Sequence, residues 1–125
     1  CRDAGLEGLM DEGLTLSTRP SVVQERAAQL ARKAGIDGFI CPGEVAAMAV
    51  LAGLQDDGHS IGRDVDVIAK QTSPTFDLYR PQIDTIYEDI RAAGEALGRL
   101  LLRRIAGERP ETLTILLPPN ANFRT

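Results

Sequence analysis

The sequence contains few of the residues on which catalytic and metal centres depend. It has one histidine, His59, and two cysteines, Cys1 and Cys41, among its 125 residues. No CxxC or Cys/His pair has the spacing of a metal site, and two distant cysteines do not make a disulfide framework. We therefore expect no metal, no cofactor and a reducing, cytoplasmic setting.

Aromatic residues are also scarce, at 4% of the chain with no tryptophan, so Leu, Ile, Val and Ala must form the core. No apolar run approaches the roughly 18 residues of a membrane-spanning helix, and no signal segment opens the chain. The net charge of −4, from 14 basic and 18 acidic residues, opposes nonspecific binding to DNA or anionic membranes. The sequence predicts one soluble domain without a membrane partner.

Short apolar segments alternate with helical patterns along the chain. Buried strands are predicted at residues 36–41 and 65–69, with another extended segment at 83–87. A helix is predicted from Pro20 to Ala34, with Ser17 or Thr18 as its N-cap. Further helices are expected at 3–13, 44–55 and 88–106, and short strands at 14–16 and 112–117. Alternation of strand and helix predicts an α/β fold, a parallel sheet flanked by helices.

The corner Cys41-Pro42-Gly43-Glu44 stands where a strand passes into a helix. It could be a catalytic thiol, a phosphate cradle, a ligand contact or only a turn. A catalytic thiol needs a histidine or an electropositive pocket, and nothing places His59 nearby. A phosphate cradle needs bare backbone amides where Glu44 stands, and Glu44 instead suits the positive end of the helix dipole. A turn with a structural cysteine is favoured over a catalytic thiol or a phosphate cradle.

Ligands of open α/β sheets bind outside the carboxyl ends of the strands. The corner at 41–44 follows one strand and residues 70–73 follow the next, so both loops should border the same crevice. Arg2, just before the first predicted helix, could bind an anionic or hydroxylated ligand or remain a solvated surface residue.

Two long segments resemble the C-terminal half of lac-repressor-like (LacI/GalR) transcription regulators. They are DGFICPGEVAAMAVLAGLQDDGHSIGRDVDVIA at 37–69 and RPQIDTIYEDIRAAGEALGRLLLRRIAGERPETLTILLPP at 80–119. The resemblance implies a periplasmic-binding-protein-like type I fold, in a two-lobed effector sensor that also carries an N-terminal helix-turn-helix DNA-binding domain. It implies that this chain is a fragment, the C-terminal part of that sensor.

The resemblance also implies a division of the chain. Residues 1–81 would form the C-terminal lobe, and residues 82–107 a crossover segment and long helix that packs on an N-terminal lobe absent from this chain. Residues 108–125 would be a return strand and tail. The long helix should then leave an apolar face exposed or cover it by self-association or swapping. The implied partners are a second copy in a homodimer and operator DNA, the latter only through the headpiece missing from this chain.

The resemblance further implies an effector site formed by Arg2, Gly43, Glu44, Lys70, Gln71 and Glu88. Arg2 stands where relatives have an arginine that binds effector hydroxyl or carboxylate groups. Gly43 and Glu44 replace the usual Asn-Asp, and Gln71 replaces an effector-binding aspartate. These departures weigh against a typical sugar, so the expected effector is a sugar, a sugar acid or another carboxylate, with acceptor oxygens favoured.

Two other interpretations stay open at the sequence level. A periplasmic solute-binding protein has the same lobe architecture, although it would carry a signal peptide. A flavodoxin-like or receiver domain would show an acidic cluster and a phospho-acceptor pattern that this sequence lacks. The resemblance favours the effector-sensing portion of a bacterial LacI-type regulator over both, and implies that the chain is not an enzyme.

Overall fold

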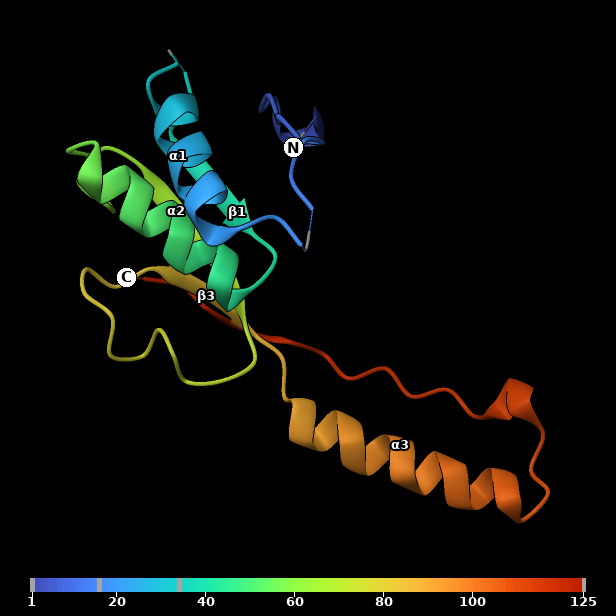
Figure 1. Ribbon diagram of the computed structural model, residues 1–125. Helices are drawn as coiled ribbons and strands as arrows, with labels where there is room; N and C mark the ends of the chain where they lie inside the picture. Colours follow the sequence, from blue (N-terminus) through green and yellow to red (C-terminus); the bar gives the residue numbers. More distant parts are fainter. Residues whose placement is uncertain (1, 16, 34, 125) are drawn as a thin grey trace.

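The computed structural model describes residues 2–15, 17–33 and 35–124. They form a four-stranded sheet with helices against it and a long arm that extends away from it (Figure 1). The elements along the chain are η1 (Arg2–Ala4), α1 (Pro20–Ala31), β1 (Gly38–Cys41), α2 (Glu44–Asp56), β2 (Asp66–Gln71), β3 (Asp84–Tyr87), α3 (Ile90–Ile105), η2 (Pro110–Thr112) and β4 (Asn120–Asn122). The predicted α/β fold is confirmed.

The sheet is mostly parallel, with its strands in the order β1-β2-β3-β4. Strand β2 pairs in parallel with β1 and β3, while β4 returns antiparallel to β3. The register sets Cys41 beside Ala69 and Gln71 beside Tyr87. The carboxyl ends of β1, β2 and β3 therefore meet along one edge of the sheet, which we call the carboxyl edge.

Helix α2 supplies much of the core. Its Leu51 and Leu54 are fully buried and belong to one apolar cluster with Val67 and Ala69 of β2. Helix α2 contacts β1 and β2, and α1 packs mainly against α2. On the other face of the sheet Ile40 is 80% exposed. Among the described residues, the helices thus cover one face of the sheet. The sequence pattern had led us to expect helices on both faces.

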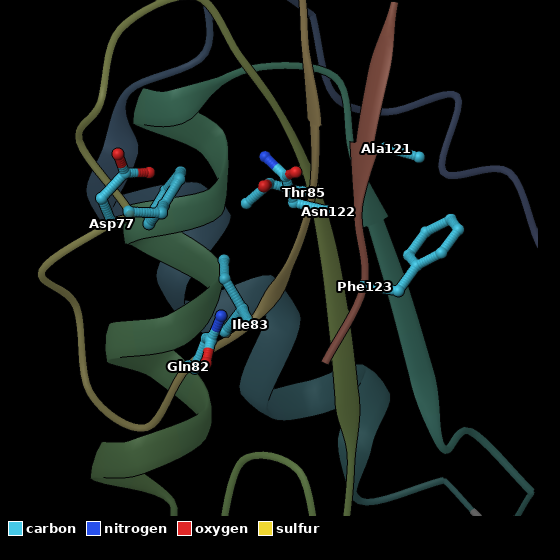
Figure 2. A pocket seen from close by; sticks show the side chains of 8 residues that line it. Asp77, Gln82, Ile83, Thr85, Ala121, Asn122 and Phe123 are labelled. Carbon is cyan, nitrogen blue, oxygen red and sulfur yellow. The ribbon is translucent and has the colours of Figure 1, made fainter. Parts of the chain in front are cut away.

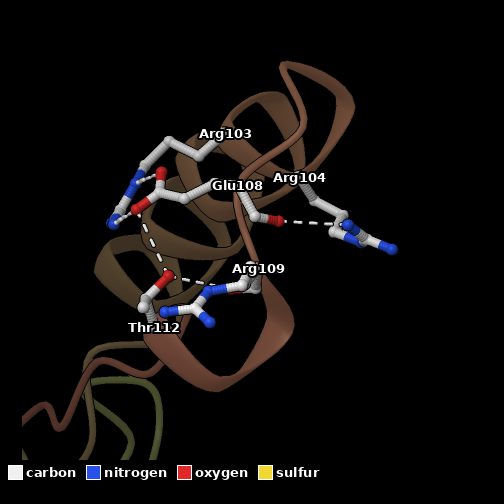
Figure 3. A network of polar contacts seen from close by, with 5 residues as sticks. All are labelled: Arg103, Arg104, Glu108, Arg109 and Thr112. Carbon is white, nitrogen blue, oxygen red and sulfur yellow. Dashed lines mark hydrogen bonds and ion pairs between the residues drawn. The ribbon is translucent and has the colours of Figure 1, made fainter.

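Helix α3 forms the arm, beginning where Asp89 accepts a hydrogen bond from the Ala92 amide at 2.9 Å. At its far end the Glu108 carboxylate pairs with Arg103 and accepts a hydrogen bond from the Thr112 hydroxyl at 3.4 Å (Figure 3). The Glu108 carbonyl also accepts from Arg104 at 3.0 Å. These contacts bind the last turn of α3 to the segment that follows it. The chain then runs back to the sheet and forms β4.

The predicted helix at 3–13 is wrong, because only the turn Arg2–Ala4 is helical. Its apolar side chains are largely exposed, namely Leu6 at 62%, Leu9 at 63% and Met10 at 83%. A helix this short is marginal in water unless its apolar face packs on a partner, and here that face has no surface to cover. The strand predicted at 14–16 is also wrong for Leu14 and Thr15, while Leu16 lies outside the described residues.

Two further boundaries differ from the prediction. Helix α1 has Arg19 as its N-cap without a side-chain hydrogen bond, because the Thr18 hydroxyl instead accepts from the Thr15 amide at 2.8 Å. That helix ends at Ala31, and Ala34 lies outside the described residues. The strand predicted at 112–117 is wrong, since residues 113–119 are irregular and the strand forms at Asn120–Asn122, where β3 offers a hydrogen-bonding edge.

Candidate functional site

The turn from β1 to α2 brings Glu44 to the carboxyl edge. Gly43 is the N-cap of α2 in an extended backbone conformation and offers the helix no side-chain cap. Glu44 is the first residue of the helix and is half-buried. Its side chain does not turn back to cap α2 but reaches the loop that follows β2.

The Glu44 carboxylate collects hydrogen bonds from two adjacent residues. Its Oε1 accepts from the Thr72 amide at 3.1 Å, the Ser73 amide at 2.9 Å and the Ser73 hydroxyl at 2.6 Å. Its Oε2 accepts from the Thr72 hydroxyl at 3.4 Å. These donors, the Ser73 hydroxyl foremost, lower the pKa of Glu44 although partial burial opposes them. Glu44 is therefore ionised at neutral pH and fastens the β2–β3 loop to α2.

An ion pair spans the same edge between β2 and the start of the arm. The Lys70 ammonium lies 3.1 Å from the Glu88 carboxylate, with the two side chains 43% and 49% exposed. The Glu88 amide donates to the Gln71 carbonyl at 2.9 Å, which fixes the backbone beside that pair. Because the pair is solvent-exposed, a polar ligand can compete for either group at modest cost.

Gln71 points to the other face of the sheet from Lys70, as alternation along β2 requires. Its side chain is 2% exposed and donates to Asp77 and to the Thr85 hydroxyl, each at 3.4 Å. Its Oε1 accepts from the Phe76 amide at 3.3 Å. In this geometry Gln71 holds the β2–β3 loop against the sheet. Its neighbour Lys70 points to the opposite face, which the described helices do not cover.

Cys41 is buried at the end of β1, with 4% of its surface exposed. Burial raises the pKa of its thiol to about 11, so almost no thiolate is present at neutral pH. The structural interpretation of this cysteine agrees with its position in the core cluster.

The structure thus places Gly43 and Glu44 directly after β1, Lys70 and Gln71 at the end of β2, and Glu88 directly after β3, all along the carboxyl edge. The printed contacts form two separate groups, one of Glu44 with Thr72 and Ser73 and one of Lys70 with Glu88. The backbone of Arg2 lies in η1, but its side chain lies outside the described residues. Sequence reasoning missed the part that Thr72 and Ser73 play. Adjacent hydroxyl residues directly after a buried strand were the available signal, since such residues often satisfy a neighbouring carboxylate.

A separate hollow of about 530 Å³ lies beside β3 and β4. Figure 2 shows Thr85 and Asn122 on the same side of the sheet as Asp77 and Ile83. The remaining lining residues are Phe76, Gln82, Ala121 and Phe123. None of the predicted effector-binding residues whose side chains the structure describes lines it. The hollow adjoins Gln71, which donates hydrogen bonds to two of its lining residues, Asp77 and Thr85.

The described residues form neither a metal site nor a membrane-spanning helix. No group of three or more His, Cys, Asp or Glu side chains there is arranged to hold a metal ion. In the same part of the chain, no helix is long and apolar enough to cross a membrane.

The family assignment rests on a match over nearly the whole chain and not on one motif. Residues 2–125 match the family described as periplasmic binding protein-like domain. The chain belongs to this family. Ligand sites of parallel α/β sheets lie at the carboxyl ends of the strands, where Glu44 and Lys70 are found.

Relatives of this periplasmic binding protein-like chain include transcription regulators. It is 28% identical over 89 residues to the HTH-type transcriptional regulator RegA of Clostridium acetobutylicum, covering 71% of this chain and 27% of that regulator. A LacI family transcriptional regulator from Arthrobacter, solved in complex with lactose, is 26% identical with a TM-score of 0.73, over 84% of this chain and 41% of its own. A LacI family regulatory protein from Chloroflexus aggregans, at 22% identity, shares the fold with a TM-score of 0.79 over 96% of this chain and 44% of its own.

The chain therefore spans about a quarter of the RegA sequence, as its 27% coverage shows. The relatives are named as regulators, in agreement with the prediction of a protein that is not an enzyme. The predicted resemblance to LacI-type regulators is confirmed by the Arthrobacter regulator at 26% identity.

Proposed function

We propose that this chain is the effector-binding part of a LacI-type transcription regulator, with its ligand bound along the carboxyl edge. The observation that carries the proposal is the position of Glu44, Lys70 and Glu88, each at the carboxyl end of one of three neighbouring strands. The regulator names of its relatives support the choice of a regulator over a solute-binding protein.

The proposed effector is a small polyhydroxylated molecule, a sugar or a sugar acid. The exposed Lys70–Glu88 pair offers both a donor and an acceptor to hydroxyl groups. The Arthrobacter relative was solved with lactose, which supports a carbohydrate. Gly43, Glu44 and Gln71 differ from the residues usual at these positions in LacI-type regulators. This difference is the reason to include sugar acids among the proposed effectors.

The arm supports a second part of the proposal, which concerns lobe architecture. Helix α3 has only Ala96 buried, while Leu97, Leu101 and Ile105 are more than 60% exposed. We propose that residues 1–81 form one lobe, that residues 82–107 cross to a second lobe which covers this face, and that residues 108–125 return. A ligand between the lobes would favour one lobe arrangement, and operator affinity of a homodimer would change with it.

The test uses the full-length protein that contains this chain. A thermal-shift screen should include lactose, galactose, galacturonate and gluconate, followed by operator-binding measurements with each stabilising compound. We expect at least one sugar or sugar acid to raise the Tm and to change operator affinity. Stabilisation by none of them, or specific binding to no DNA, would count against the proposal.

A further inference from the structure

The β2–β3 loop presents a cluster of hydrogen-bond donors that is already filled by a carboxylate. Consecutive backbone amides of Thr72 and Ser73 point at a single oxygen of Glu44, at 3.1 and 2.9 Å. The Ser73 hydroxyl reaches the same oxygen at 2.6 Å and lies 2.6 Å from the Thr75 hydroxyl. Successive amides aimed at one point form a concavity suited to an anionic oxygen.

We propose that Thr72 and Ser73 form a carboxylate subsite of the effector site, which Glu44 occupies in this structure and from which an effector carboxylate displaces it. This inference rests on the proposed function and narrows its ligand class to sugar acids and related carboxylates. Glu44 acts here as an internal stand-in for the ligand, and not as a group that grips it.

Charge and position make this exchange possible. One carboxylate replaces another, so the donors of Thr72 and Ser73 keep a partner of the same charge. Thr72, Ser73 and Glu44 are all half-buried, so a rotation of the Glu44 side chain carries its carboxylate into solvent. The freed carboxylate stays at the first position of α2, where the positive end of the helix favours it.

Neighbouring charges leave room for an acidic ligand. The Lys70 ammonium lies on the same edge, where its ion-pair partner among the described residues is the exposed carboxylate of Glu88. An effector with a carboxylate in the subsite and hydroxyl groups toward Lys70 and Glu88 would use both features. A neutral sugar would leave Glu44 in place and gain only the second.

Amide hydrogen exchange at Thr72 and Ser73 tests the subsite without knowledge of the effector. In Glu44→Ala we expect both amides to exchange at least about tenfold faster, because their acceptor is gone. Acetate at about 100 mM, a concentration suited to a contact of millimolar affinity, should restore slow exchange. Acetamide, and sodium chloride at equal ionic strength, should not. In the wild-type chain acetate should change nothing, since the tethered Glu44 outcompetes it.

Two further variants keep the test decisive. Glu95→Ala removes an exposed carboxylate from α3 and should leave Thr72 and Ser73 exchange as in the wild type, with no response to acetate. Glu44→Ser retains a residue that helix starts accept well, and it should respond to acetate as Glu44→Ala does. Failure of acetate to slow exchange in both folded Glu44 variants overturns the subsite.

The full-length protein separates this inference from the proposed function. We expect galacturonate or gluconate to stabilise it more than the neutral sugars galactose and glucose, and the Glu44→Ala variant to bind the acid at least as tightly. Stabilisation by a neutral sugar alone would overturn the inference and leave the proposed function standing. Absence of operator binding would contradict the proposed function whatever acetate does to Thr72 and Ser73.

Discussion

Arg124 secures the end of the described chain to the sheet. Its guanidinium pairs with Asp66 at the start of β2 and lies 3.1 Å from Asp84 at the start of β3. Its amide also donates to Asp84 at 2.8 Å. Both carboxylates raise the pKa of Arg124, and the side chain is 24% exposed, so the contacts are partly shielded from solvent. Strand β4 is therefore held by side chains as well as by its pairing with β3.

Replacement of Arg124 by alanine should destabilise the chain by about 1–2 kcal/mol, a value that allows for partial exposure of the pairs. Urea unfolding measures the change, and hydrogen exchange should show the β4 amides opening first. Arg63→Ala is the matched control, because the Arg63–Asp64 pair is 80% exposed on its arginine side. Equal stability of the two variants would show that Arg124 does not hold β4.

Glu44 should make stability depend on pH in the acid range. Its pKa is lowered from 4.5 in the folded chain, so its contribution is fully present above that value and is lost as the pH falls through the folded pKa. Glu44→Gln should cost about 1 kcal/mol at neutral pH, and the difference from wild type should shrink on acidification. A constant difference between pH 7 and pH 3 in urea titrations would contradict this assignment.

At the scale of elements, the contact between α1 and α2 depends on Gly53. A methyl group at this position would overlap the backbone carbonyl of Gln24 on α1. Gly53→Ala should therefore force the helices apart and cost about 1–3 kcal/mol. A methyl group at Gly94 on α3 would meet no atom within 4 Å among the described residues, so Gly94→Ala should instead stabilise by about 0.5–1 kcal/mol. Unfolding free energies that change in the same direction for both variants would be the contrary result.

The elements that could be predicted from sequence are those whose patterns are satisfied within the chain. Five elements lie within a few residues of their predicted positions, namely β1, β2, β3, α2 and α3. Their apolar patterns or capping residues are satisfied by contacts that this chain itself provides. The predictions of a helix at 3–13 and a strand at 112–117 were wrong. A sequence pattern indicates a local conformational preference, but it does not show whether a partner surface is present. The sequence did not predict the close backbone approach at Gly53.

The site shows the same limit. The position of the carboxyl edge follows from strand order, and Glu44, Lys70 and Glu88 were expected there. The sequence did not reveal that Glu44 is turned toward Thr72 and Ser73, or that Gln71 faces the buried side. Such orientations depend on which donors the fold brings within reach, and spacing alone does not specify them.

At the scale of the whole molecule, the arm presents an apolar surface to solvent. Ile90, Leu97, Leu101 and Ile105 recur along α3 at helical spacing and are all more than half exposed. Leu116 on the return segment is 90% exposed. Apolar surface of this extent favours association when no second lobe covers it.

We therefore expect this chain, studied alone, to associate with increasing concentration in light-scattering measurements. The double variant Leu97→Glu, Leu101→Glu should shift it toward monomer. Leu78→Glu should not, because Leu78 is 88% exposed in the β2–β3 loop and lies outside the arm. A chain that stays monomeric at high concentration, with α3 docked on its own sheet, would contradict the exposed arm.

The most direct test of the proposed site is to find where a ligand binds on the full-length protein. Amide hydrogen exchange should be measured with and without the compound that stabilises it best in the thermal-shift screen. We predict that protection rises at residues 43–44, 70–73 and 88, along the carboxyl edge. Protection confined to the hollow beside β3 and β4, at residues such as Thr85 and Asn122, would contradict this prediction.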